Sequence, residues 1–145
     1  MTEMWEREDM NSKMDKMLSK WCDIERAVME KREPVPRGEN VGGRGGIGDP
    51  TANEAIRNAE KIPFVFASGV RVNQPEEWLD VFSSSYAKLD GVSREIMKRR
   101  YRFHEPYLRT STALRISDRT YYSMLDEIKS YVTIIAIQHS LIRVI

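Results

Sequence analysis

Arg119, Tyr122 and Ser123 are spaced so that they share the outer side of a helix that would begin at Asp118. A guanidinium presents its donors in a fork that matches the two acceptors on the major-groove edge of guanine. A phenol or an aliphatic hydroxyl donates a hydrogen bond to a phosphate or to a neighbouring base. The chemistry that these side chains allow is non-covalent recognition of DNA, and we predict base contacts from all three.

The sequence around these residues carries a local excess of positive charge. Between Ser93 and Arg119 there are eight basic and three acidic residues, although the whole chain has a formal net charge of only +1. Such a local field is typical of a surface that docks on phosphates. Phosphate contacts add affinity and salt dependence but little sequence information, and we predict them from Lys98, Arg99, Arg102, Arg109 and Thr110. The alternative is a solvated, arginine-rich helix face.

To be positioned for this role, the side chains require a helix-turn-helix, which the pattern predicts over residues 106–127. The first helix would start at Pro106, and its inner face, at helical spacing, would be Tyr107, Thr110, Ser111 and Leu114. A tight turn follows at residues 114–117, where Ser117 can cap the second helix by accepting a bond from a free amide. The inner face of that helix would be Tyr121, Met124, Leu125 and Ile128. The alternative is that two short helices merely close a bundle.

The remaining sequence predicts a mainly α fold in three parts. Residues 1–33 form an amphipathic helix, with an apolar stripe that favours one continuous helix over residues 3–32. Residues 34–48 form a flexible Gly/Pro-rich linker, since no strand precedes its glycines and no Gly-Lys-Ser/Thr follows them, as a phosphate-binding loop would require. Residues 49–145 form a helical DNA-binding domain, beginning with a helix capped by Asp49. Within it, the apolar segments around Ser68-Gly69 predict either a small hairpin or an irregular connection.

Several kinds of site are not expected from this composition. Cys22 is the only cysteine, and His104 and His139 are far apart, so no metal-ligand set can be assembled. No carboxylate stands at a catalytic spacing from a histidine or a nucleophile, so we expect neither an enzyme nor a cofactor. The N-terminus lacks an apolar signal-peptide core, and residues 131–145 are too short to cross a bilayer as a helix. We therefore expect an intracellular protein without a membrane segment.

Two motifs resemble the ArpU/RinA-type phage transcriptional regulators. One is Leu114-x-Ile-Ser-x-Arg-Thr-Tyr-Tyr122, preceded by Arg100-Tyr101, and the other is the upstream Gly48-Asp-Pro-Thr-Ala52. The resemblance covers about Gly48 to Leu125 and implies a helix-turn-helix like that of sigma-factor region 4. Three features depart from the family pattern: Thr110-Ser111 stands where an aliphatic residue followed by alanine is usual, the acidic Asp118 opens the second helix, and the apolar end at Ile145 replaces a polar tail.

This resemblance implies a sequence-specific activator of phage or prophage late genes in the cytoplasm of a bacterial host. Its partners would be double-stranded DNA, further copies of the chain in a homodimer or higher oligomer, and the host RNA polymerase. One alternative is a phage assembly protein such as a small terminase subunit, which also joins a helix-turn-helix to an oligomerising helix but forms rings for DNA packaging. Another is an adaptor that uses the same fold to bind protein only.

Overall fold

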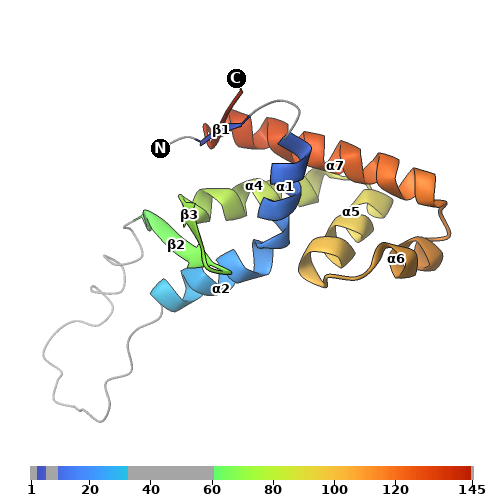
Figure 1. The fold of residues 1–145 in the computed structure, drawn as a ribbon, viewed down its shortest axis with the longest axis horizontal. Coiled ribbons are helices and arrows are strands. Elements are labelled where there is room, and N and C mark those ends of the chain that lie inside the picture. The colour runs from blue at the N-terminus through green and yellow to red at the C-terminus, as the bar shows by residue number, and fades with distance from the viewer. Residues whose placement is uncertain (1–2, 6–9, 33–60, 145) are drawn as a thin grey trace, which may run out of the picture.

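The computed structural model describes residues 3–5, 10–32 and 61–144 of the 145-residue chain. The fold is mainly helical, as predicted, with two small two-stranded sheets (Figure 1). In chain order the elements are β1 (Glu3–Trp5), α1 (Met10–Ser19), α2 (Trp21–Arg32), β2 (Phe64–Ala67), β3 (Val70–Asn73), α4 (Pro75–Lys88), α5 (Gly91–Met97), the π-helical turn η3 (Lys98–Arg102), α6 (Tyr107–Leu114), α7 (Asp118–Gln138) and β4 (Ile142–Val144).

The N-terminal helix is not continuous, so the prediction of one helix over residues 3–32 is wrong. Residues Glu3–Trp5 form a strand, and the helix is broken at Lys20, whose N–H bonds to the Met17 carbonyl at 3.0 Å. Helical spacing alone does not reveal this break, because the apolar residues keep nearly the same period across it. The change of direction lets both helices bury their apolar side chains, which are Met14, Leu18, Trp21, Ile24 and Val28.

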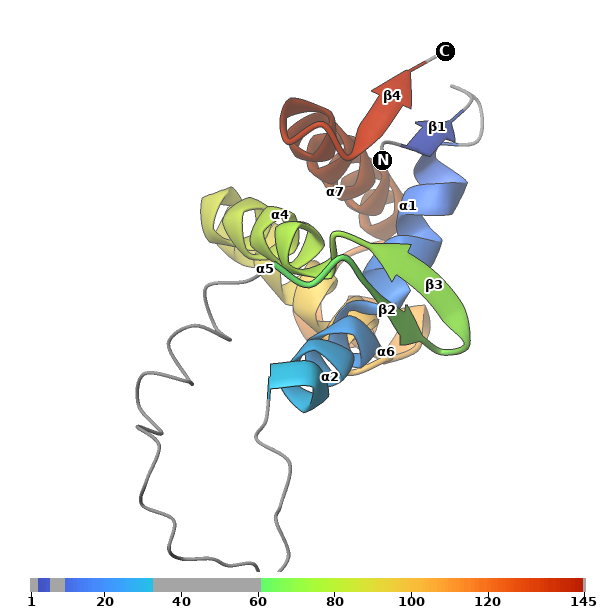
Figure 2. The same cartoon turned by 90° about the vertical axis from the view of Figure 1, so that its left-hand side faces the viewer.

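One hydrophobic core joins the elements before residue 33 to those after residue 60. Helix α1 packs against α7, α2 packs against β2 and α4, and both α4 and α5 pack against α7 (Figures 1 and 2). The largest fully buried side chains of this core come from both parts of the chain: Tyr101, Tyr121, Phe82, Met14, Leu18, Ile24, Ile96, Met97, Leu125, Ile128, Val81 and Val132. The N-terminal helices therefore belong to the same folded unit as α7.

The hairpin is the better of the two predictions for the segment around Ser68-Gly69. Strands β2 and β3 pair antiparallel, with Val65 opposite Val72 and Ala67 opposite Val70. Both turn residues have positive φ, 53° for Ser68 and 77° for Gly69. Such a two-residue turn matches the right-handed twist of the strands that it joins. The face that carries Val65, Ala67 and Val72 is buried in the core.

A second, parallel sheet was not predicted from the sequence. Strand β1 pairs with β4, so that Glu3 lies opposite Ile142 and Trp5 lies opposite Val144. The apolar C-terminal stretch is therefore divided between two elements: α7 ends at Gln138, and the chain turns at Ser140, where φ is 62°. Leu141 and Ile142 are buried after this turn, which accounts for the apolar character of the last residues.

The predicted Gly/Pro-rich linker at residues 34–48 and the helix expected from Asp49 lie outside the described residues. Gly48 to Ala52, one of the two motifs that carry the family resemblance, lies there as well. Among the described parts of the chain, no helix is long and apolar enough to cross a membrane.

Candidate nucleic-acid interface

The candidate interface is built on α6, the turn after it, and the first turns of α7. Helix α6 starts after Pro106 and ends in a left-handed residue, Arg115. The Ile116 N–H bonds to the Ser111 carbonyl at 3.0 Å, across the end of the helix. Helix α7 is capped by Ser117, whose Oγ accepts a hydrogen bond from the Thr120 N–H at 3.0 Å. Helix α6, the turn and the start of α7 lie at the predicted residues, but α7 continues to Gln138, past the predicted end at residue 127.

The inner faces of α6 and α7 also agree with the prediction. Thr110 and Ser111 of α6 and Tyr121 and Leu125 of α7 are buried. The Tyr107 ring packs beside the Tyr121 ring, with centroids 6.0 Å apart. The Tyr107 ring also contacts the Tyr122 ring, with centroids 5.3 Å apart. Thr110 and Ser111 are therefore part of the packed side of α6.

The predicted base-contacting residues are brought together on the exposed side of α7. Arg119, Tyr122 and Ser123 are all exposed, Tyr122 at 45%. At about 100° per residue, Arg119 and Ser123 lie nearly opposite the buried side of the helix, whereas Tyr122 is turned toward Tyr107. Arg119 and Ser123 therefore project furthest from the core. The carboxylates of Asp118 and Asp126 share this exposed surface.

Thr110 is not exposed to solvent, as a contact with a DNA phosphate would require, so the predicted phosphate contact from Thr110 is wrong. Its side chain is fully buried, and its Oγ1 donates a hydrogen bond to Glu105 Oε1 at 2.6 Å. Arg99 Nη1 reaches the same carboxylate oxygen at 3.2 Å. The hydrogen bond from Thr110, together with Arg99, outweighs desolvation and lowers the pKa of Glu105. Thr110 thus anchors α6 to the preceding segment.

The basic residues between α5 and α6 are engaged within the molecule. Lys98 Nζ and Arg99 Nε both bond to the Glu95 carboxylate, each at 2.9 Å. Arg102 Nη2 contacts Glu25 Oε1 at 3.0 Å, and its guanidinium lies 4.9 Å from the centre of the Trp21 ring. Three of the predicted phosphate contacts, Lys98, Arg99 and Arg102, therefore already have acidic partners from the chain itself.

Arg100 and Tyr101 connect the π-helical turn to α1 through Asp15. The Tyr101 hydroxyl donates to Asp15 Oδ1 at 2.7 Å, and Arg100 Nε donates to the same oxygen at 3.2 Å. Burial alone would raise the pKa of Asp15, but these two hydrogen bonds outweigh it and lower the pKa below its usual value. Burial and the Asp15 carboxylate raise the pKa of Tyr101 well above its usual range.

The unpaired positive charge of the basic region is concentrated on α6, the turn and α7. Arg109, Arg115 and Arg119 are exposed, and none of them forms an ion pair or side-chain hydrogen bond with another described residue. Arg94, by contrast, donates to the carbonyls of Tyr86 and Ala87 at the end of α4. The net charge along the sequence therefore does not distinguish the paired basic residues from Arg109, Arg115 and Arg119, which form no ion pair with another described residue.

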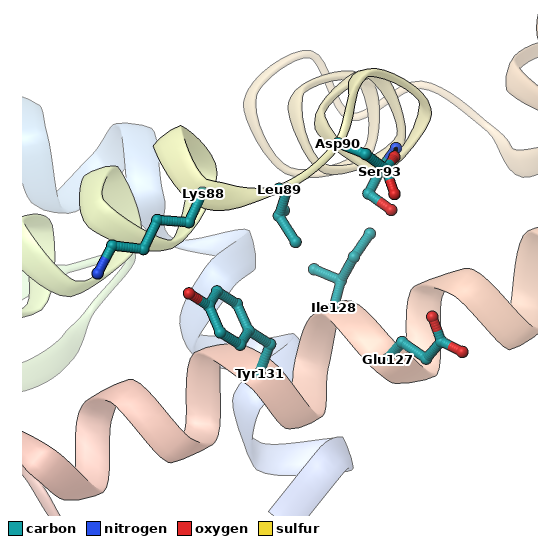
Figure 3. Close-up of a pocket in the computed structure, with 7 residues that line it drawn as sticks. All are labelled: Lys88, Leu89, Asp90, Ser93, Glu127, Ile128 and Tyr131. Carbon is teal, nitrogen blue, oxygen red and sulfur yellow. Dashed lines mark hydrogen bonds between the residues drawn. The ribbon is translucent and has the colours of Figure 1, made fainter.

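A cavity of about 310 Å³ lies away from this surface, between the end of α4, the start of α5 and α7 (Figure 3). Ile128 and Tyr131 point from α7 toward Leu89. The rim carries one cation, Lys88, and the carboxylates of Asp90 and Glu127. Across the described parts of the chain, no group of three or more His, Cys, Asp and Glu is placed to hold a metal ion.

Comparison of the chain with protein-family models, with curated proteins and with solved structures found no match.

Proposed function

We propose that the protein binds double-stranded DNA through α6, the turn and α7, and regulates the transcription of phage late genes. The observation that carries the proposal is the pairing pattern of the basic residues. The basic residues of η3 are bonded to Glu95, Glu25 and Asp15, whereas Arg109, Arg115 and Arg119 remain exposed and without an ion pair among the described residues. The resemblance to ArpU/RinA-type regulators supports the regulatory part.

In this proposal the first turns of α7 enter the major groove, as the second helix does in helix-turn-helix proteins. Arg119 recognises a guanine edge, because its two parallel donors match the O6 and N7 acceptors. Ser123, one turn further along the same side, donates to a neighbouring base, and Tyr122 reaches a base or a phosphate at the edge of the groove. Arg109 on α6 contacts a phosphate and adds affinity that depends on salt.

Selection of tight-binding duplexes from a random library tests the proposal. We expect enrichment of a short motif that contains a guanine, and Arg119→Ala should weaken binding to that motif by about 1–3 kcal/mol and relax the preference at one position. Arg143→Ala is a matched control, because Arg143 is an exposed arginine in β4, at the other end of α7 (Figure 1). No enriched motif, or an affinity that survives Arg119→Ala combined with Arg109→Ala, would contradict the proposal.

We further propose that the active species is a homodimer, since paired recognition helices bind half-sites separated by a whole number of helical turns. Light scattering of the full chain measures this directly. A dimer supports the regulator. A large ring would instead indicate a packaging role for the same DNA-binding surface.

A further inference from the structure

Arg115 occupies a backbone conformation that arginine rarely adopts. Its φ is 59° and its ψ is 46°, in the left-handed region. The Arg115 N–H bonds to the Thr112 carbonyl at 3.2 Å, and the Ile116 N–H bonds to the Ser111 carbonyl at 3.0 Å. These two bonds define the Schellman motif that ends many helices, in which the left-handed position is usually glycine.

No contact of the Arg115 side chain with another described residue offsets the strain of its backbone. Arg115 is exposed, and it forms no ion pair or side-chain hydrogen bond with another described residue. A residue with a Cβ is strained in the left-handed region, whereas glycine adopts it freely. Backbone strain of this kind clusters at functional sites, and in the described chain it also occurs at Ser68, Gln74, His104 and Ser140.

The neighbours of Arg115 indicate which ligand this is. The residue lies in the turn before Ser117, the cap of α7, and in the sequence it stands between the unpaired Arg109 of α6 and Arg119 of α7, whose first turn also carries Asp118. The free amides at the start of α7 add partial positive charge beside it. Arginine binds a phosphate with two parallel hydrogen bonds, which glycine at the same position cannot provide.

We infer that Arg115 is a further DNA-contacting residue, which binds a backbone phosphate next to the groove that α7 enters. The inference rests on the proposed function and adds to it a contact that the sequence pattern did not assign. The phosphate contact is non-covalent and independent of the base sequence. It compensates, in the DNA complex, for a strained turn in the free protein.

The variant Arg115→Gly separates a phosphate-binding role from a structural one, because its melting temperature should rise while its affinity for DNA falls. We expect the variant to melt at a higher temperature than the wild type, since glycine relieves the left-handed strain. It should also bind the selected duplex more weakly. The slope of log K against log salt, which is negative, should become shallower by about 0.9. Between 50 and 200 mM NaCl, the wild type should then lose about three- to four-fold more affinity than the variant.

Two further variants serve as controls. Arg115→Lys keeps the charge and the strain, so it should keep most of the salt slope and a melting temperature close to that of the wild type. Arg143→Ala removes an exposed arginine in β4, at the other end of α7, and should leave the slope unchanged.

The outcomes distinguish this inference from the proposed function. If the wild type binds no duplex DNA, both are overturned. If the wild type binds and Arg115→Gly keeps the wild-type slope and affinity, the phosphate contact alone is overturned. If Arg115→Gly lowers the melting temperature as well as the affinity, the role of Arg115 is to hold the turn, which also overturns the inference.

Discussion

Asp15 holds the basic segment before α6 in place. Its carboxylate accepts hydrogen bonds from Tyr101 and Arg100, and both donors belong to the π-helical turn that leads toward α6. Glu25 plays a similar part for Arg102, and Glu95 does so for Lys98 and Arg99. At the scale of single residues, the contacts of Asp15 and Glu25 therefore join the π-helical turn to α1 and α2.

Replacing Asp15 by Asn should lower the free energy of unfolding by about 1.5–3 kcal/mol, the range for hydrogen bonds to a charged group. The pKa of Asp15 is lowered in the folded state. Its stabilisation is therefore present above the unfolded pKa of about 3.9 and is lost as the pH falls through the folded pKa. Urea unfolding at several pH values should show this acid-side loss in the wild type and a weaker one in Asp15→Asn.

Tyr101 adds a limit at the alkaline side of the same profile. Its pKa is raised in the folded state, so its stabilisation is full below the unfolded pKa of about 10 and is lost as the pH rises above it.

Asp126→Asn is the control for Asp15→Asn, because its 3.6 Å pair with Lys129 leaves the aspartate side chain 66% exposed. A stability equal in Asp15→Asn and in the wild type at neutral pH would show that the anchor is dispensable.

At the scale of elements, the start of α7 is set by a single serine. The Ser117 Oγ accepts a hydrogen bond from the Thr120 N–H. Without this hydroxyl, the Thr120 amide in the first turn of α7 loses its hydrogen-bond acceptor. Ser117→Ala should lower the free energy of unfolding by about 0.5–2 kcal/mol. Ser123→Ala, an exposed substitution in the same helix, should change it by less than about 0.5 kcal/mol. Equal effects of the two substitutions in chemical denaturation would rule out a capping role.

The elements that the sequence predicts best are those whose signals are local. The Ser117 cap and the helical spacing of Tyr121, Leu125 and Ile128 place α7 and its buried face correctly. The β1–β4 sheet depends on pairing between Glu3 and Ile142, which no local pattern indicates. The ion pairs of Arg100 and Arg102 have the same origin, since Asp15 and Glu25 are more than seventy residues away from them in sequence. The pairs of Lys98 and Arg99 with Glu95 are local, at helical spacings of three and four residues.

At the scale of the whole molecule, α1 and α7 depend on one shared core. Met14 of α1 is fully buried in the cluster that includes Leu125 and Val132 of α7. Met14→Ala should lower the free energy of unfolding by about 2–5 kcal/mol, as is typical of large-to-small changes in a core. Met29→Ala is the matched control, because Met29 lies on α2 with 57% of its surface exposed.

Unfolding should also occur in one step. Tryptophan fluorescence, to which the buried Trp21 and Trp78 contribute, and far-ultraviolet circular dichroism should give coincident transitions. Two separate transitions would show that the N-terminal helices fold independently of α7.

We propose that α6, the turn and the start of α7 form a DNA-binding surface. Amide chemical shifts of the full chain, followed by nuclear magnetic resonance during titration with the selected duplex, test it most directly. We predict that the largest changes occur between Tyr107 and Ser123, with Arg115 and Arg119 among them. Changes confined to the β2–β3 hairpin and α2, or no changes at all, would contradict the claim.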